Sequence, residues 1–180
     1  MIEIYYTGSL SFNEEQKDKD KSLGGFLSST KVPNDILSNL FGDISLYTLE
    51  ERLRETRAII LFNNSEYPII DLESWIDIPE GTLGKYSIST VNIEPDSQGE
   101  VYMESITNVR GAPFNSNFHQ LQGEDSKLLL SEELPPGGFM GVWLRREITD
   151  SDLESISCST DDTKKLPTKS FISLCFSWDD

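Results

Sequence analysis

Residues 134–148 read Leu-Pro-Pro-Gly-Gly-Phe-Met-Gly-Val-Trp-Leu-Arg-Arg-Glu-Ile, and they carry the clearest structural signal in the chain. The prolines and glycines predict a turn, because proline presets φ and glycine accepts the positive φ that other residues resist. The residues that follow alternate as in a strand, with Met140, Val142, Leu144 and Ile148 on one face and Phe139, Trp143, Arg145 and Glu147 on the other. Because both faces carry large side chains, we expect a central strand here.

The C-terminal run 170–179 is the expected partner of that strand. Its alternation places Ile172, Leu174, Phe176 and Trp178 on one face and Ser173, Cys175, Ser177 and Asp179 on the other. We expect the two strands to pair at the centre of an antiparallel β domain. Neither strand carries a residue pattern typical of catalysis.

Length, composition and charge exclude several classes of protein. At 180 residues the chain can form one domain with a sizeable core, and hydrophobic and aromatic fractions of 37% and 10% argue against a mostly disordered protein. The formal net charge of −16 repels phosphate backbones and anionic lipids, so we expect neither a nucleic acid nor a membrane as partner. The simplest interpretation of this negative charge is that it keeps the protein soluble. The alternative is that it attracts an electropositive protein partner.

The two cysteines and the N-terminal residues indicate a protein folded in a reducing cytoplasm. Cys158 and Cys175 are isolated thiols and do not form a disulfide framework. The start of the chain lacks the features of a signal peptide, and no apolar run approaches transmembrane length.

Six further runs have the composition of strands, and they set the fold class. They are residues 2–7, 56–63, 68–78, 86–93, 100–106 and 128–130. Residues 56–63 form a continuous apolar run typical of a buried central strand, and the short connection at 64–68 predicts a hairpin with the next run. The apolar phase shifts between Ile88 and Val91, which predicts a β-bulge. About eight strands in one domain, residues 1–180, predict a mainly β, antiparallel two-sheet sandwich of the immunoglobulin or jelly-roll kind.

The segment 9–54 does not fit this strand pattern. It contains a polar loop at 11–22 and the pair Gly24 and Gly25, followed by apolar residues at helical spacing from Ile36 to Phe41. Asn34 can cap such a helix and Gly42 can end it. We therefore expect an inserted arm or long loop at about 9–54, irregular or helical, and long ordered loops are usually functional.

The chain lacks the residue sets that catalysis or metal binding requires. Its single histidine, His119, lies in an Asn/Gln-rich loop without an acidic or cysteine partner at ligand spacing, so we expect a hydrogen-bonding role. A calcium-loop-like run begins at Asp18, but its twelfth position is Ser29 in place of glutamate. We expect a non-enzymatic protein without a metal or cofactor.

Several aromatic and arginine side chains are candidates for contact with other chains. Trp75 lies between Glu73 and Asp77 on the polar face of its strand. Either a second layer or the 9–54 arm covers it, or another chain contacts it. The same question applies to aromatic residues in loops. The interface candidates are Phe26, Phe41, Trp75, Arg110, Phe114 and Phe118. We expect the arginines 57, 110, 145 and 146 to form internal or surface ion pairs with acids.

Four segments together resemble a known family. Residues 23–30 read Leu-Gly-Gly-Phe-Leu-Ser-Ser-Thr, residues 39–45 Asn-Leu-Phe-Gly-Asp-Ile-Ser, and residues 56–64 Thr-Arg-Ala-Ile-Ile-Leu-Phe-Asn-Asn; a Pro-Gly and tryptophan strand follows at 134–145. In this order they resemble small virion structural proteins of tailed bacteriophages. Thr56 departs from the family pattern, in which an aromatic residue precedes the arginine.

The resemblance implies a virion protein of the neck or tail, made in the bacterial host cytoplasm. It implies a β-sandwich that multimerises into a ring and contacts adjacent virion proteins, and it points to the short-tailed crAss-like phages with stacked rings. It brings no catalytic residues. Two alternatives remain: a capsid decoration or carbohydrate-binding sandwich, whose aromatic residues would cluster on one exposed rim, and a hydrolase with paired carboxylates.

Overall fold

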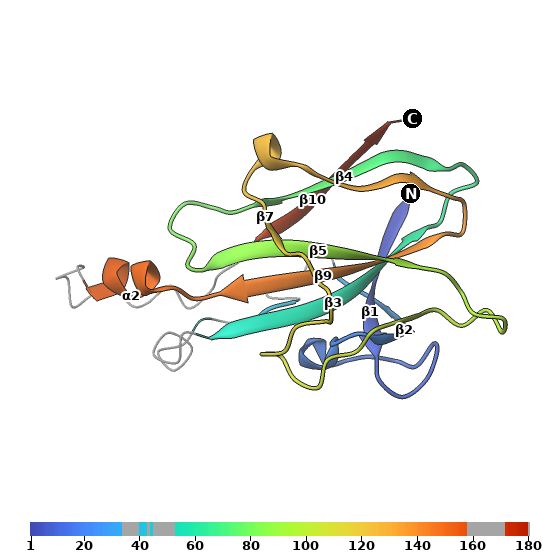
Figure 1. The fold of residues 1–180 in the computed structure, drawn as a ribbon, viewed down its shortest axis with the longest axis horizontal. Coiled ribbons are helices and arrows are strands. Elements are labelled where there is room, and N and C mark those ends of the chain that lie inside the picture. The colour runs from blue at the N-terminus through green and yellow to red at the C-terminus, as the bar shows by residue number, and fades with distance from the viewer. Residues whose placement is uncertain (34–39, 43, 45–52, 158–171, 180) are drawn as a thin grey trace.

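The computed structural model describes residues 1–33, 40–42, 44, 53–157 and 172–179, which form two antiparallel sheets (Figure 1). The larger, seven-stranded sheet runs in the order β6 (Tyr102–Met103), β2 (Gly25–Lys31), β1 (Ile2–Gly8), β3 (Arg54–Asn63), β9 (Phe139–Glu147), β5 (Lys85–Ile93) and β7 (His119–Gln120). The smaller, three-stranded sheet runs β10 (Ser173–Asp179), β4 (Ile69–Asp77) and β8 (Leu128–Leu134). Short helices are η1 (Lys19–Lys21), η2 (Glu124–Ser126) and α2 (Asp150–Ser157). The predicted mainly β, two-sheet architecture is confirmed.

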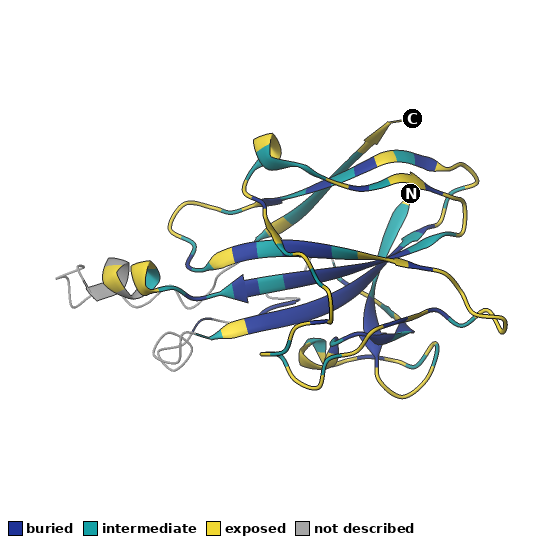
Figure 2. Ribbon diagram, in the orientation of Figure 1, coloured by how far each residue is buried: buried dark blue, intermediate teal, exposed yellow. Residues whose placement is uncertain are grey.

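Strands β3 and β9 form the centre of the larger sheet. They pair in register from Arg54 opposite Glu147 to Phe62 opposite Phe139. Both are buried over most of their length (Figure 2), since apolar side chains cover the two faces of the sheet. The predictions that residues 56–63 and the strand after residue 138 are central strands are therefore confirmed.

The main core lies between the two sheets. Alternation along each strand turns every second side chain inward. The fully buried members of this core are Ile59 and Leu61 of β3, Leu72 and Ile76 of β4, Ile88 of β5, and Met140, Val142 and Leu144 of β9. Partly buried side chains of β1 and β10 pack against it, including Ile2, Ile4, Leu174 and Phe176. Trp178, which was expected on the same face as Leu174 and Phe176, is 42% exposed.

A second apolar cluster covers the outer face of the larger sheet. It joins Trp143 and Ile60 to Val101 and Met103, which come from the chain between β5 and β7. This cluster explains the apolar phase shift in β5, since Ile88 faces the main core whereas Ile93 faces the outer cluster. β5 pairs with β9 without a register break, so the predicted bulge in residues 86–93 is wrong. A register break lies instead in β4, next to Asp71 with a φ of 47°.

Two predicted pairings are also wrong. β10 pairs with β4 in the smaller sheet and not with β9, while β3 and β4 belong to different sheets and form no hairpin. Asn63 stabilises the crossover between the sheets. Its buried Nδ2 donates hydrogen bonds to the carbonyl oxygens of Tyr67 at 2.9 Å and Leu134 at 3.0 Å, which joins the β3–β4 connection to the end of β8. The predicted turn follows there, with Gly137 at a φ of 71°.

The predicted arm at 9–54 contains a strand of the larger sheet. β2 pairs with β1 and β6, so residues 25–31 belong to the sandwich itself. Gly24 and Gly25 start this strand with φ values of 86° and 94°, and a Cβ on Gly24 would lie 1.9 Å from the Glu104 carbonyl oxygen. The helix predicted over Ile36 to Phe41 falls mostly outside the described residues.

Truncation of Trp143 tests whether the outer cluster is a true second core. Its side chain is 2% exposed, so Trp143→Ala should lower the free energy of unfolding by about 3–5 kcal/mol, measured by urea denaturation. Trp75→Ala is the matched control, because Trp75 is only half-buried and should cost clearly less. Equal losses in the two variants would show that the outer cluster contributes no more than a surface contact.

Candidate functional site

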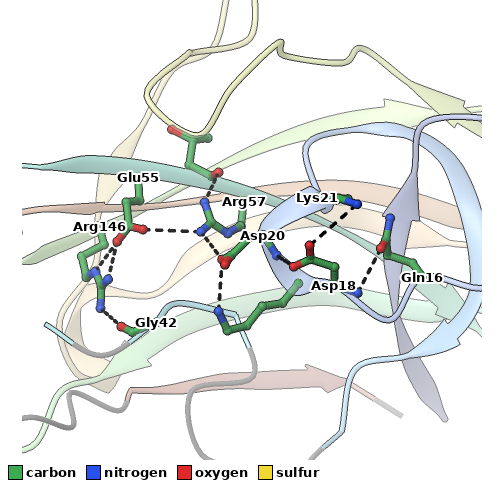
Figure 3. Close-up of polar contacts among 10 residues, drawn as sticks. Gln16, Asp18, Asp20, Lys21, Gly42, Glu55, Arg57 and Arg146 are labelled. Atoms are coloured by element: carbon green, nitrogen blue, oxygen red, sulfur yellow. Dashed lines mark hydrogen bonds and ion pairs between the residues drawn. The ribbon is translucent and has the colours of Figure 1, made fainter.

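The inner face of the larger sheet ends in charged side chains (Figure 3). Glu55 and Arg57 of β3 lie on the face of Ile59, and Arg146 of β9 lies on the face of Leu144. Asp20 of η1 approaches the same cluster from the loop before β2. We call these four side chains the arginine network.

Three of the four side chains of the arginine network are largely buried, Asp20 is 55% exposed, and the charges of the network balance. Arg146 donates two hydrogen bonds to the Glu55 carboxylate, one of them from Nε at 3.0 Å, and its Nη1 donates to the Gly42 carbonyl at 2.8 Å. Arg57 Nη2 lies 2.6 Å from Asp20 Oδ1 and 3.4 Å from Glu55 Oε1. The Arg57 and Arg146 side chains are 2% and 1% exposed, so each guanidinium needs these acids to remain inside the fold.

Phe41 completes the network. Its ring centroid lies 5.1 Å from the Arg146 guanidinium carbon and 5.8 Å from that of Arg57, and its edge contacts Tyr86 at a centroid distance of 6.0 Å. With only 4% of its surface exposed, Phe41 is a core residue of this chain. The ring thus packs against the cations and joins residues 40–42 to the ends of β3 and β9.

Asp20 is held in its ionised form. Burial raises the pKa of its carboxyl, but hydrogen bonds from Lys19 and Arg57 outweigh burial and lower the pKa below its ordinary value. Asp18 caps η1, accepting a hydrogen bond from the Asp20 N–H at 3.0 Å. Every acid of the network is engaged by a cation, so the arrangement suits positioning of the loop and not proton transfer.

The part of the chain that the structure describes contains no group of three or more His, Cys, Asp or Glu side chains that could hold a metal ion. His119 Nε2 lies 3.0 Å from Asn117 Nδ2, and Cys175 is a half-buried free thiol. Cys158 lies outside the described residues. Among those described, no helix is long and apolar enough to cross a membrane.

The six interface candidates lie in different parts of the fold. Phe26 is half-buried and meets Tyr102 edge-on at 5.0 Å, while Phe118 is half-buried beneath the Arg145 guanidinium at 3.5 Å. Arg57 and Arg146 form the predicted ion pairs, whereas Arg145 stacks on the Phe118 ring.

Of the remaining four candidates, Phe41 is buried in the arginine network. Trp75 is half-buried, with Lys127 Nζ 5.1 Å above its ring. Arg110 is exposed, and the Phe114 side chain is 80% exposed. Their role in an interface stays a prediction.

Sequence reasoning missed an aromatic cluster on the outer face of the larger sheet. Phe62 and Phe139 stack at a centroid distance of 4.8 Å, and Tyr5 meets Phe62 edge-on at 6.5 Å. With four further residues these rings line a groove of about 310 Å³, which we call the aromatic groove. Its lining is Tyr5, Asn13, Leu27, Ser28, Ser29, Phe62 and Phe139. Alternation places each ring on an outward face, but only the pairing of β1, β3 and β9 brings them together.

Polar contacts hold one wall of the aromatic groove in place. The Tyr5 hydroxyl donates to Glu3 Oε2 at 2.6 Å, and Lys31 Nζ lies 2.7 Å from Glu3 Oε1. Hydrogen bonds from Lys31 and Tyr5 lower the pKa of Glu3 from 4.5 to about 2. The Tyr5 ring is therefore oriented before any ligand or partner arrives.

No family model, curated protein or solved structure matches the chain.

Removal of the central acid tests the arginine network. Glu55→Gln leaves two buried guanidinium groups short of a counter-charge, so the free energy of unfolding should fall by about 3 kcal/mol or more in urea denaturation. Arg54→Gln, the adjacent control, breaks an exposed ion pair with Glu147 and should cost less than about 1 kcal/mol. Similar small losses in both variants would contradict a structural role for the network.

The lowered pKa of Glu3 predicts a pH dependence of stability. A carboxyl whose folded pKa lies below its unfolded value stabilises the fold above pH 4.5, and this stabilisation is lost as the pH falls from 4.5 to about 2. Glu3→Gln should therefore be less stable than the wild type at pH 6, and the difference should disappear by about pH 2. Urea denaturation at a series of pH values measures it; a difference that is constant with pH would contradict the pairing.

Proposed function

We propose that this chain is a non-enzymatic structural protein of a phage virion, which multimerises into a ring of the neck or tail and contacts adjacent virion proteins. The observation that carries the proposal is the contrast between its charges and its aromatic surfaces. The buried charges neutralise one another, whereas an uncharged aromatic groove and the exposed ring of Phe114 remain accessible in a chain of net charge −16. Accessible aromatic residues surrounded by polar surface are typical of protein interfaces.

The resemblance to virion proteins supplies the kind of assembly. Three of its segments contribute to neighbouring parts of the larger sheet: residues 23–30 contain most of β2, residues 56–64 most of β3, and residues 134–145 most of β9. These strands are all paired within the larger sheet. They would keep one shape in every copy of a ring, as closed rotational symmetry requires.

A carbohydrate- or surface-binding module is the second candidate, and the aromatic groove favours it. Three rings gather on one surface, and Asn13 and Ser29 add polar groups beside them. Sugars bind against aromatic faces with hydrogen bonds at the edge of the ring. Such a protein would bind glycans as a monomer, which separates it from the assembly protein.

Self-association under varied salt tests the proposed function. Because each copy carries a net charge of −16, repulsion opposes association and screening should relieve it. Raising NaCl from about 20 mM to about 500 mM should increase the mass measured by light scattering, with closed rings in negative-stain images. A chain that stays monomeric at every salt and protein concentration, alone and with other virion proteins, would sink the assembly proposal and favour glycan binding.

A further inference from the structure

We propose that the aromatic groove receives the Phe114 side chain of a second copy of this chain, so that copies join head to tail. This inference rests on the proposed function, because it names the contact through which the copies associate. Three observations carry it: the way the chain presents Phe114, the chemistry of the groove, and the distribution of charge.

Phe114 is exposed although its loop is firmly anchored. Its side chain is 80% exposed, yet its N–H donates to both carboxylate oxygens of Glu104, at 2.8 and 3.0 Å. The neighbouring Pro113 is buried, and the Gly111 carbonyl accepts a hydrogen bond from Thr56 Oγ1 of β3 at 2.9 Å. An exposed ring on an anchored loop loses little conformational entropy on binding, so it is well suited to insert into a partner.

The aromatic groove matches such a ring in size and chemistry. Its volume of about 310 Å³ is at the lower end of ligand-pocket volumes, which suits one aromatic side chain better than a large ligand. Phe62, Phe139 and Tyr5 offer both stacked and edge-on contacts. Because Glu3 already binds the Tyr5 hydroxyl, the groove presents mainly apolar ring surface.

These two surfaces contain fewer charged residues than the chain as a whole. Charged residues make up 26% of the chain, yet residues 111–123 contain no aspartate, glutamate, lysine or arginine. The lining of the aromatic groove is also uncharged, and the nearby Glu3 and Lys31 neutralise each other. Beside Phe114 lies the Glu104 carboxylate, whose two oxygens accept hydrogen bonds from the Phe114 N–H. Two acidic copies therefore bring few like charges together where the 111–123 loop meets the groove, and the cores of protein interfaces are depleted of charge in the same way.

The two surfaces lie at opposite ends of β3, which determines the kind of contact. The Phe114 loop is anchored at Thr56, whereas Phe62 lines the groove, and six residues of strand separate these positions by roughly 20 Å. A contact between different surfaces of identical chains is heterologous. It generates a closed ring when the rotation between copies closes.

The test uses three variants of the full chain that each add one negative charge. Phe114→Glu removes the inserted ring, Ser29→Glu places a carboxylate in the groove, and Leu129→Glu is the control. Ser29 is exposed, and Leu129 is 46% exposed on β8 of the smaller sheet. Sedimentation velocity in about 500 mM NaCl should show self-association weakened at least tenfold by the first two substitutions and nearly unchanged in the control. Far- and near-UV circular dichroism checks that every variant is folded.

Mixing the two interface variants gives a sharper result. The Phe114→Glu variant keeps an intact groove, and the Ser29→Glu variant keeps an intact Phe114. One contact can therefore form, in which Phe114 of the second variant enters the groove of the first. An equimolar mixture should therefore yield 1:1 dimers that do not grow, although each variant alone is monomeric.

The outcomes separate this inference from the proposed function. A wild-type chain that never associates overturns both. A wild-type oligomer that survives Phe114→Glu, or that survives Ser29→Glu, overturns only the pairing of Phe114 with the groove and leaves the assembly proposal standing. The inference also fails if Ser29→Glu abolishes binding of a glycan or of another virion protein without changing self-association, because the groove then has a different occupant.

Discussion

The pairing of β3 with β9 is the constraint on which the rest of the fold depends. The two strands are paired along their whole length and carry large apolar side chains on both faces, so each face must be covered. The smaller sheet covers one face, and the chain between β5 and β7 covers the other. The chain therefore leaves the larger sheet after β3, returns for β5, leaves again for β8 and returns for β9.

The arginine network follows from the same constraint. The inner-facing side chains near the end of the β3–β9 pair are Glu55, Arg57 and Arg146, and Phe41 and η1 cover them. Such charges are tolerated there only because they neutralise one another, and a buried set of this kind contributes little net stability compared with well-packed apolar residues. Its benefit is positional: the network holds Asp20 and residue 42 against the sheet.

The sequence predicted the features that depend on local alternation and not those that depend on which strands meet. β1, β9 and β10 were expected because apolar residues recur at every second position, and β3 because its apolar run is short, continuous and closed by polar residues. The sequence does not show which sheet β10 joins, because alternation identifies the buried face of a strand and not its partner strand. β2 was missed because Ser28, Ser29 and Thr30 give it a polar composition. The aromatic groove was missed because its residues come from strands far apart in the chain, and Asp20 lies 37 positions before its partner Arg57.

The negative charge of the chain limits the surfaces through which two copies can associate. Each copy carries a net charge of −16, so encounters between its acidic surfaces are repulsive, and such repulsion restricts orientation as effectively as attraction does. The aromatic groove lies on paired strands and the 111–123 loop is bonded to β3, so neither surface needs to become ordered on contact. The β3–β9 pair must be covered on both faces. It also fixes the spacing between the aromatic groove and the exposed ring of Phe114.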